Sequence, residues 1–417
     1  MKPALDLRPL PPEAWPELVR LHGIAFGGGY DAQAQREKPL PDERDVRGYL
    51  GVFDAQGRLA SALQVLPFAV GYDGHIVGML GIGGVATLPE QRAQGNVRAL
   101  LTHVFEQADA YMQHCETQQP QALYSALYPF SNSYYRRFGY EAILLPSATV
   151  NMTAFEAFGQ PDSVEMLAEP GDAHGASLDT LTALHDAFAR TCNLNALRGG
   201  AENTWNDALN GGLKKARYAY LMRDADGTPN AYLVLHSHSD PGNQYRNRLT
   251  LRDFGCRDEA SLRKALGFLY TLRARYTEVS MMLPADTAPY TWFAEPYDGT
   301  FAQQSCGMAR LLDARRGLEL MRHPRGSGGY TLQVTDAFCP KNDGVYRVEY
   351  QDGKALAVRE NGGTPDAGVS IEALALLTLG CLSWREALGR GDVRPYANDV
   401  TLSEVFIKKR LYPADRY

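Results

Sequence analysis

The spacing of apolar residues in the first third of the chain predicts one helix followed by two strands. Residues 14–26 carry apolar side chains at three- and four-residue intervals, which is typical of an amphipathic helix, and glycines 27–29 end it. A polar stretch that extends to residue 45 is expected to be a loop. Two β-prone runs, residues 59–68 and 75–88, flank the turn Tyr72-Asp73-Gly74 and therefore predict a strand pair.

Helical spacing resumes directly after Gly95 and continues from Val97 to Met112. Two further β-prone runs follow, at residues 122–127 and 147–152. The first structural unit is therefore expected to close near residue 155.

A stretch rich in turn formers, residues 161–175, is expected to link this unit to a second one. The second unit repeats the order of elements in the first. It has an expected helix, three strands and a second helix, at residues 178–192, 218–223, 231–236, 248–254 and 261–276.

The pattern changes again near Met308, where an apolar run begins. Short strands separated by turns such as Asp352-Gly353 are expected at residues 330–334, 344–350 and 354–359, with helices at residues 371–380 and 384–389. We therefore expect an α/β (α+β) protein of three units, which comprise residues 1–155, 156–307 and 308–417.

Composition narrows the classes of partner. The chain has 417 residues, of which 45% are hydrophobic and 22% charged, so several packed cores can form. A net charge of -6 argues against a nucleic-acid binder. No apolar run has the roughly 20 residues that a membrane span needs. The six cysteines form no CxxC pair, and no signal peptide is recognisable, so we expect a cytoplasmic protein with reduced thiols.

The segment from Gly84 to Leu101 carries the most specific chemistry. It is expected to form a strand, a turn at Gly95 and the start of a helix. A glycine at such a turn permits close approach of the backbone, and a helix start presents unpaired N–H groups at its positive end, so the segment suits a pyrophosphate. Arg92 and Arg98 can add charge-assisted hydrogen bonds.

This segment resembles the coenzyme-A signature of the GNAT superfamily of N-acetyltransferases, Arg/Gln-x-x-Gly-x-Gly/Ala. Arg92, Gly95 and Val97 occupy the three motif positions, and Val97 replaces the usual small residue. The enhanced intracellular survival (Eis) branch of the superfamily shares this departure.

A second segment supports the same branch. Residues 133–140 are similar to its Tyr-x-Arg-Phe-Gly-Tyr motif, with Tyr135 at the first tyrosine. The resemblance implies that Tyr135 is the general acid that protonates the leaving thiolate, and that the terminal carboxylate of Tyr417 is the general base. A phenol suits the first task, because its ordinary pKa of about 10 is close to that of a thiol.

The resemblance also implies which residues bind the donor, acetyl-CoA. The strand before the signature is expected to bind the pantetheine arm through its main chain, and the turn and helix start to bind the diphosphate. These predicted cofactor-binding residues are Val85, Ala86, Thr87, Arg92, Ala93, Gln94, Gly95, Asn96, Val97 and Arg98.

The same branch implies the architecture and the acceptors. The architecture is two tandem GNAT folds with mixed central sheets flanked by helices, the second without the cofactor signature, and then a sterol-carrier-protein-like domain. Acceptors are amines, such as aminoglycosides, polyamines or lysine side chains, and the assembly is a homo-oligomer, a hexamer in this branch. A long-chain N-acyltransferase and a non-enzymatic lipid carrier remain as alternatives.

No metal site is expected. His236, His238 and Asp240 alternate along a predicted strand and share one face, which is a ligand-like spacing. Pro241-Gly242 follows at once and places Asp240 in a turn, however, and no motif elsewhere offers a fourth ligand.

Overall fold

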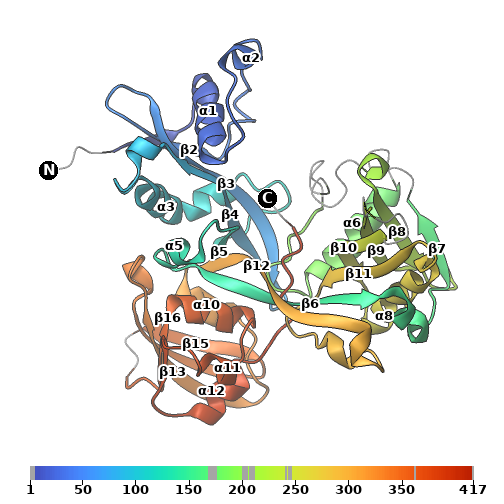
Figure 1. The fold of residues 1–417 in the computed structure, drawn as a ribbon. Coiled ribbons are helices and arrows are strands. Elements are labelled where there is room, and N and C mark those ends of the chain that lie inside the picture. The colour runs from blue at the N-terminus through green and yellow to red at the C-terminus, as the bar shows by residue number, and fades with distance from the viewer. Residues whose placement is uncertain are drawn as a thin grey trace.

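A computed structural model describes residues 5–167, 176–199, 205, 212–239, 242, 247–360 and 363–415. The strands form two sheets. The first has the order β1-β2-β3-β4-β5-β12-β6-β11-β10-β9-β8-β7, and the second has the order β15-β14-β13-β16-β17. Figure 1 shows three lobes, coloured blue to cyan, green to yellow, and orange to red. The expected α/β (α+β) class is confirmed.

The N-terminal unit contains the expected helix, the long strand pair and the helix after Gly95. Its elements are β1 (Asp6–Pro9), α1 (Trp15–Ala25), α2 (Ala32–Arg36), β2 (Tyr49–Phe53), β3 (Leu59–Tyr72), β4 (His75–Thr87), α3 (Asn96–Glu106), α4 (Ala108–Met112), β5 (Ala122–Leu127), α5 (Asn132–Arg136) and β6 (Glu141–Asn151). The helix expected to reach Met112 breaks at Gln107, which separates α3 from α4. The expected loop contains α2, because the Asp31 side chain accepts hydrogen bonds from two N–H groups of its first turn.

The second unit repeats the sheet-and-helix arrangement. It contains β7 (Ser163–Met166), α6 (Ala176–Ala189), β8 (Arg217–Arg223), β9 (Pro229–His238), β10 (Asn247–Cys256), α8 (Glu259–Gly267), β11 (Tyr276–Met282) and β12 (Gly299–Leu311). Two expectations were wrong. The helix expected over residues 261–276 is an α-helix only to Gly267 and a 3₁₀-helix from Phe268 to Leu272, and Tyr276 begins β11, where its buried ring belongs to the sheet core. Part of the expected linker forms β7, which pairs with β8; residues 168–175 lie outside the described residues.

Strand β12 joins the two units into one sheet. It lies between β5 and β6 and pairs antiparallel with both, with Met308 opposite Leu127 on one side and Ala142 on the other. Strand β6 in turn pairs with β11 of the second unit. The expected boundary between residues 307 and 308 therefore falls inside a strand that the first two units share.

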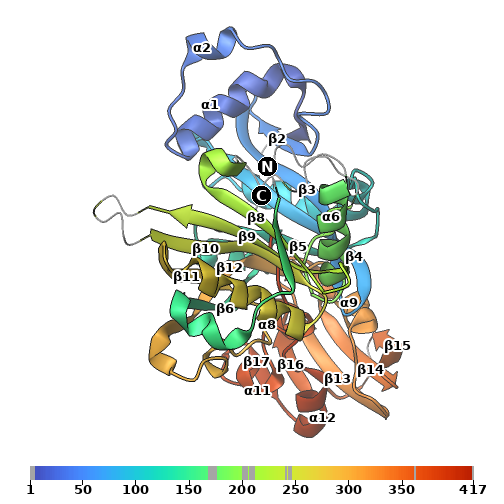
Figure 2. The same cartoon turned by 90° about the vertical axis from the view of Figure 1, so that its right-hand side faces the viewer.

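The C-terminal unit packs a buried helix against its own sheet. Its elements are α9 (Ala314–Leu320), β13 (Ser327–Thr335), β14 (Gly344–Gln351), β15 (Lys354–Glu360), β16 (Ala367–Ser370), α10 (Ile371–Leu379), α11 (Trp384–Ala387), β17 (Val393–Pro395) and α12 (Asp399–Val405). Helix α10 is apolar nearly all round, and it contacts β13 and β16 of this sheet as well as β6 and β12 of the large one. Figure 2 shows the small sheet and its helices below the large sheet.

The three units share one apolar core. It includes Val70 of the first unit, Leu233 of the second and Leu374 of the third, all fully buried. None of the helices in the described ranges has the length and apolarity that crossing a lipid bilayer requires.

Candidate active site

Strand β4 carries a bulge at the point where the expected signature begins. Ala62 of β3 pairs with Ala86 and Gln64 pairs with Gly83, so Leu63 alone faces the two residues between them. Gly84, one of these two, has a φ of +57°, which favours glycine. The His22 imidazole donates to the Gly84 carbonyl over 3.1 Å, and this bond holds α1 against the bulge.

Beyond the bulge, β4 diverges from β5. Their parallel pairing ends at Ile82 and Leu127. Residues 83–87 still pair with β3 on one side, and the Ser61 hydroxyl donates to the Ala86 carbonyl over 2.8 Å. On the side that faced β5, no described strand pairs with β4 past Ile82, so main-chain groups of residues 85–87 can form sheet-like hydrogen bonds to an extended ligand there.

The turn between β4 and α3 presents N–H groups at a helix start. Ala93 and Gly95 have φ values of +58° and +91°, and Gly95 is the N-cap of α3. No side chain caps this helix, which has 11 residues, so its first N–H groups and its positive end are open to an anion. A Cβ placed on Gly95 would meet no described atom within 4 Å, so the turn faces open space.

A cavity of about 720 Å³ connects these features. It is lined by Ala25, Phe26, Val85, Ala86, Thr87, Gln91, Arg92, Ala93, Gly95, Asn96, Val97, Arg98, Phe130, Tyr134, Arg137 and Phe138. The lining contains three arginines and neither aspartate nor glutamate. This charge suits the phosphates of a nucleotide, because the guanidinium groups can form charge-assisted hydrogen bonds with phosphate oxygens.

Two of the arginines are oriented by aromatic rings. The Arg98 guanidinium lies 5.1 Å from the centroid of the Phe338 ring, and the Arg137 guanidinium lies 4.6 Å from that of Tyr134. Phe26 and Phe130, at the rim of the cavity, are 61% and 75% exposed. Both exposed rings therefore line the same cavity as the three exposed arginines.

Tyr135 lies on α5, directly behind the cavity lining. Its side chain is 3% exposed, and its ring packs at 5.2 to 6.2 Å from the rings of Tyr134, Phe130 and Tyr140. Burial, reinforced by the neighbouring Tyr134, raises the pKa of Tyr135 well above its usual value. The phenol therefore keeps its proton at neutral pH, as a proton donor must.

The segment that carries Tyr135 is fixed by a buried arginine of β12. The Arg310 guanidinium donates to the Phe138 carbonyl and forms a 2.5 Å ion pair with Asp336, and neither charged side chain is exposed. Gly139 has a φ of +79°, and a Cβ at that position would overlap the Arg310 guanidinium. The glycine of this segment is therefore required both by its backbone conformation and by the close approach of a charge from another unit.

The structure brings most of the predicted site residues together. Nine of the ten predicted cofactor-binding residues line the cavity, and Gln94 does not. Tyr135 adjoins the lining residue Tyr134, both in sequence and through a ring contact. Tyr417 lies outside the described residues, and the chain that leads to it reaches Asp415, whose carbonyl accepts a hydrogen bond of 2.7 Å from the Tyr128 hydroxyl. The roles of these residues in binding and catalysis stay predictions.

Seven of the lining residues were not among the predicted site residues: Ala25, Phe26, Gln91, Phe130, Tyr134, Arg137 and Phe138. Tyr134 and Arg137 flank Tyr135 inside the motif, so their place at the site could have been inferred from one turn of helix. Phe26 and Phe130 come from segments with no motif, and no local signal identifies them.

The histidines of β9 form no recognisable metal site. His238 Nε2 lies 3.0 Å from the Thr250 hydroxyl, and Asp240 lies outside the described residues. Within the described part of the chain, no group of three or more His, Cys, Asp and Glu side chains is arranged to hold a metal ion.

Comparisons with known proteins identify two domains in the sequence. Residues 6–143 match the acetyltransferase (GNAT) domain, and residues 309–412 match the sterol carrier protein domain. No curated protein matches the sequence.

Solved structures share the whole fold at low sequence identity. A GCN5-related N-acetyltransferase from Anabaena variabilis is 18% identical, with a TM-score of 0.78 over 99% of this chain and 100% of that one. Eis1 from Mycobacterium abscessus is 17% identical, with a TM-score of 0.75 over 99% and 100%. A GCN5-related N-acetyltransferase from Kribbella flavida is 20% identical, with a TM-score of 0.72 over 99% and 98%.

GNAT enzymes use acyl-CoA donors, which agrees with the strand, turn and helix start that surround the cavity. The chain therefore contains a GNAT acetyltransferase domain and a C-terminal sterol carrier protein domain, and it shares its overall fold with Eis1 from Mycobacterium abscessus.

Proposed function

We propose that this protein transfers an acetyl group from acetyl-CoA to an amine by direct attack of the amine on the thioester. The observation that carries the proposal is the 720 Å³ cavity, in which the open edge of β4, the Gly95 turn and three arginines meet. The open strand edge suits the amides of a pantetheine arm, and the helix start suits a diphosphate.

The donor thioester needs hydrogen-bond donors where negative charge develops on its oxygen. In this proposal a main-chain N–H of the segment from Val85 to Thr87 supplies one, since these residues line the cavity and have lost their partners on β5. A main-chain donor on a strand that β3 still holds is pre-organised, so little reorganisation is needed during the reaction.

Tyr135 is the proposed general acid. When the tetrahedral intermediate collapses, the carbon–sulfur bond breaks, and the phenol donates its proton to the departing thiolate. The raised pKa keeps this proton in place beforehand, and the Tyr135 ring packs against Tyr134, which lines the cavity, at 5.2 Å between ring centroids.

The proposed general base is the terminal carboxylate of Tyr417, by resemblance to the Eis branch. A carboxylate with a pKa near 3.5 is a weak base in water, so it needs an environment that disfavours its charge. The Asp415 carbonyl accepts a hydrogen bond from Tyr128, which lies one residue past the end of β5. Tyr417 follows Asp415 by two residues, and two residues span at most about 7 Å. The anchored segment is therefore consistent with a terminus near the site.

Aminoglycosides, polyamines and lysine side chains are the proposed acceptors, and a closed homo-oligomer, a hexamer in the branch, is the proposed assembly. The arginines in the cavity disfavour a polycation there, so the acceptor is expected to approach from outside the phosphate-binding end.

Calorimetric titration with acetyl-CoA tests the donor half of the proposal. We expect a Kd below millimolar and competition by free coenzyme A; no binding in this range would refute it. Release of coenzyme A with a panel of aminoglycosides, polyamines and lysine peptides then identifies the acceptor. Donors from acetyl to myristoyl test the alternative of a long-chain acyltransferase, which predicts faster turnover with the longer chains.

A further inference from the structure

The second unit repeats the strand divergence that creates the donor cavity in the first. Parallel pairing between β10 and β11 ends at Leu251 and Met281, just as pairing between β4 and β5 ends at Ile82 and Leu127. Strand β10 also has an irregularity at this point, between Leu251 and Asp253. The backbone arrangement that suits an extended ligand is therefore present twice in the chain.

In the second unit, the C-terminal segment, residues 410–415, occupies this region. The chain that follows β11 donates from the Ala285 N–H to the Leu411 carbonyl over 3.1 Å. On the other side of the segment, the Asn193 N–H donates to the Arg410 carbonyl over 2.6 Å, and the Tyr412 N–H donates to the Asn193 carbonyl over 3.1 Å. The segment is thus bonded on both sides like an additional strand.

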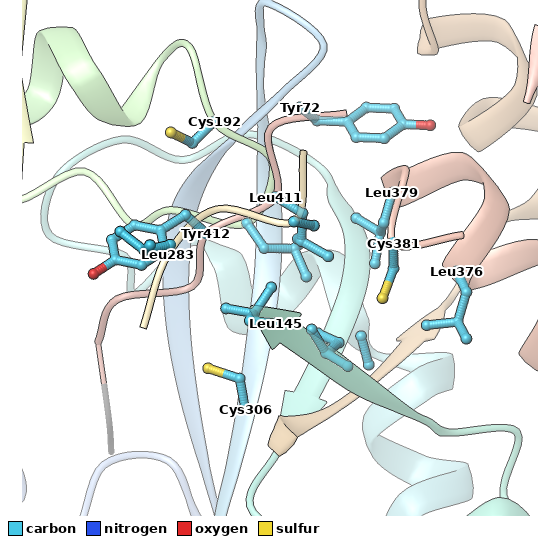
Figure 3. Close-up of a cluster of buried hydrophobic side chains, with 14 of the residues drawn as sticks. Tyr72, Leu145, Cys192, Leu283, Cys306, Leu376, Leu379, Cys381, Leu411 and Tyr412 are labelled. Atoms are coloured by element: carbon cyan, nitrogen blue, oxygen red, sulfur yellow. The ribbon is translucent and has the colours of Figure 1, made fainter. Parts of the chain in front are cut away.

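The side chains of the segment are also buried in the protein core. Leu411 is fully buried and Tyr412 is 4% exposed, in the cluster that also contains Leu145, Leu283 and Cys306 (Figure 3). The Tyr412 ring lies 5.0 Å from that of Phe254 on β10. Burial of these two large side chains removes apolar surface from water and therefore helps to hold the segment in place.

A buried charge network fixes the end of the segment. The Arg198 guanidinium lies 2.5 Å from the Asp253 carboxylate and 2.6 Å from the Asp415 carboxylate. Arg198 and Asp253 are both 2% exposed, and the guanidinium also lies 4.2 Å from the Trp205 ring centroid. Because one buried guanidinium binds both carboxylates, the position of Asp415 is tied to the interior of the second unit.

The same segment is also held by Tyr128 of the first unit and by Cys306 of the shared strand β12. The Tyr128 hydroxyl donates to the Asp415 carbonyl over 2.7 Å, and the Cys306 thiol donates to the Pro413 carbonyl over 3.4 Å. Tyr128 immediately follows Leu127, the last residue of β5 before the donor cavity. Figure 1 shows the red C-terminal segment running from the lower lobe between the other two.

We infer that the second unit is a binding site for the chain's own C-terminal segment, and that Arg198, Asp253 and Asp415 are positioning residues that direct the terminus toward the acetyl-transfer site. The strand divergence that receives a donor in the first unit receives residues 410–415 in the second. The inference rests on the proposed function for its catalytic consequence, but not for the binding of the segment.

Hydrogen exchange tests the binding independently of activity. In the Asp415→Asn variant, we expect the Asn193 and Ala285 amides, which donate to carbonyls of the segment, to exchange at least tenfold faster than in the unaltered protein. Glu278→Gln is the matched control. Glu278 pairs with Arg248 over 2.9 Å on the same strands, β10 and β11, without contacting the segment, so exchange at the two amides should be unchanged. Unchanged exchange in Asp415→Asn would overturn the inference.

Steady-state kinetics tests the catalytic consequence. We expect Asp415→Asn to lower kcat at least tenfold while the Kd for acetyl-CoA changes less than twofold. In a protein that lacks Tyr417, where the proposed base is already displaced, the same substitution should lower kcat less than twofold. An equal loss in both backgrounds would show that Asp415 acts separately from the terminus and would refute its positioning role.

The two experiments separate the inference from the proposed function. If the unaltered protein binds no acetyl-CoA, the proposed function fails, and the exchange measurement still decides whether the second unit binds the segment. If acetyl-CoA binds and turns over but Asp415→Asn has normal kcat, the inference fails and the proposed function stands.

Discussion

The two strand divergences in the large sheet differ in what fills them. In the first unit, the edge of β4 past Ile82 borders a cavity with three exposed or half-exposed arginines. In the second, the chain past Leu251 and Met281 is covered by residues 410–415, and its arginine, Arg198, is buried with two carboxylates. The same backbone geometry therefore borders an open cavity in one unit and a packed interior in the other.

This difference indicates that side chains and local partners, and not the fold of the unit, decide whether the divergence of two strands leaves an open cavity. Gly95 opens the first site at the start of α3. The second unit has no glycine-capped helix at the corresponding place, since Asp258 caps α8 with its side chain, which accepts from the Ser261 N–H. A carboxylate at that position satisfies the helix start itself and repels a phosphate.

The largest expected effect comes from exchanging the buried arginine. Arg198→Met leaves Asp253 buried without its cation, so we expect a loss of about 3 to 5 kcal/mol in the free energy of unfolding, measured by urea denaturation. The double variant Arg198→Met with Asp253→Leu should recover most of this loss. Arg92→Met, at the exposed arginine of the first unit, should change the free energy of unfolding by less than about 0.5 kcal/mol. Equal losses at Arg198 and Arg92 would contradict the distinction between the two sites.

The second prediction tests whether a residue of the first unit, Tyr135, donates the proton in the reaction. Tyr135→Phe removes the proposed proton donor, so kcat should fall on the order of 100-fold with the Kd for acetyl-CoA unchanged. Because burial raises the pKa of Tyr135, the unaltered enzyme should not lose its acid function below pH 10. Tyr111→Phe, on α4 of the same unit, is the control and should retain full kcat. A normal rate for Tyr135→Phe would exclude it as the acid.

The packed interior of the second unit should also make the stability of the protein depend on pH. Burial, aided by the nearby Arg198 charge, lowers the pKa of His185 to about 3. Between that value and the ordinary 6.5, the unfolded chain binds a proton that the folded chain does not, so stability falls as the pH falls below about 6.5. From pH 6.5 to 5 the expected loss from this residue is about 2 kcal/mol, measured by urea denaturation at each pH. His185→Gln should lose less stability over this interval; an identical pH dependence would show that His185 is not responsible.

The smallest expected effect tests whether the Gly95 turn of the first unit contacts the donor. Gly95→Ala places a methyl group at a φ of +91° in the cavity, so we expect a loss of about 1 kcal/mol in stability and a roughly tenfold higher Kd for acetyl-CoA, measured by calorimetry. Gly57→Ala, at a φ of +75° with equally open surroundings but outside the cavity lining, should show the same loss of stability with unchanged binding. Similar binding in both variants would mean that the Gly95 turn does not contact the donor.

The sequence predicted the elements whose signal is local. The run from β4 through Gly95 into α3 was placed within one or two residues, because alternation, a glycine and a helical repeat follow one another without a break. The motif around Tyr135 marked the second part of the site, although α5 itself, with five residues, was too short to be seen as a helix.

What the sequence did not predict depends on contacts between distant residues. Nothing in residues 299–311 indicates that β12 pairs with β5 and β6 of another unit, because strand partners are set by the assembled core. The role of Gly139 becomes clear only when Arg310 is seen against it. Likewise Arg198, Asp253 and Asp415 are isolated charges in the sequence and become a network only after the segments meet.

The insertion of β12 also constrains how the protein is made. A ribosome releases β5 and β6 long before residues 299–311, so a nascent first unit has an uncovered β5 edge until the second unit has been synthesised. Unpaired edges promote association between chains. Fragments that stop before residue 299 are therefore expected to aggregate or to need a chaperone, and the two GNAT-like units mature together.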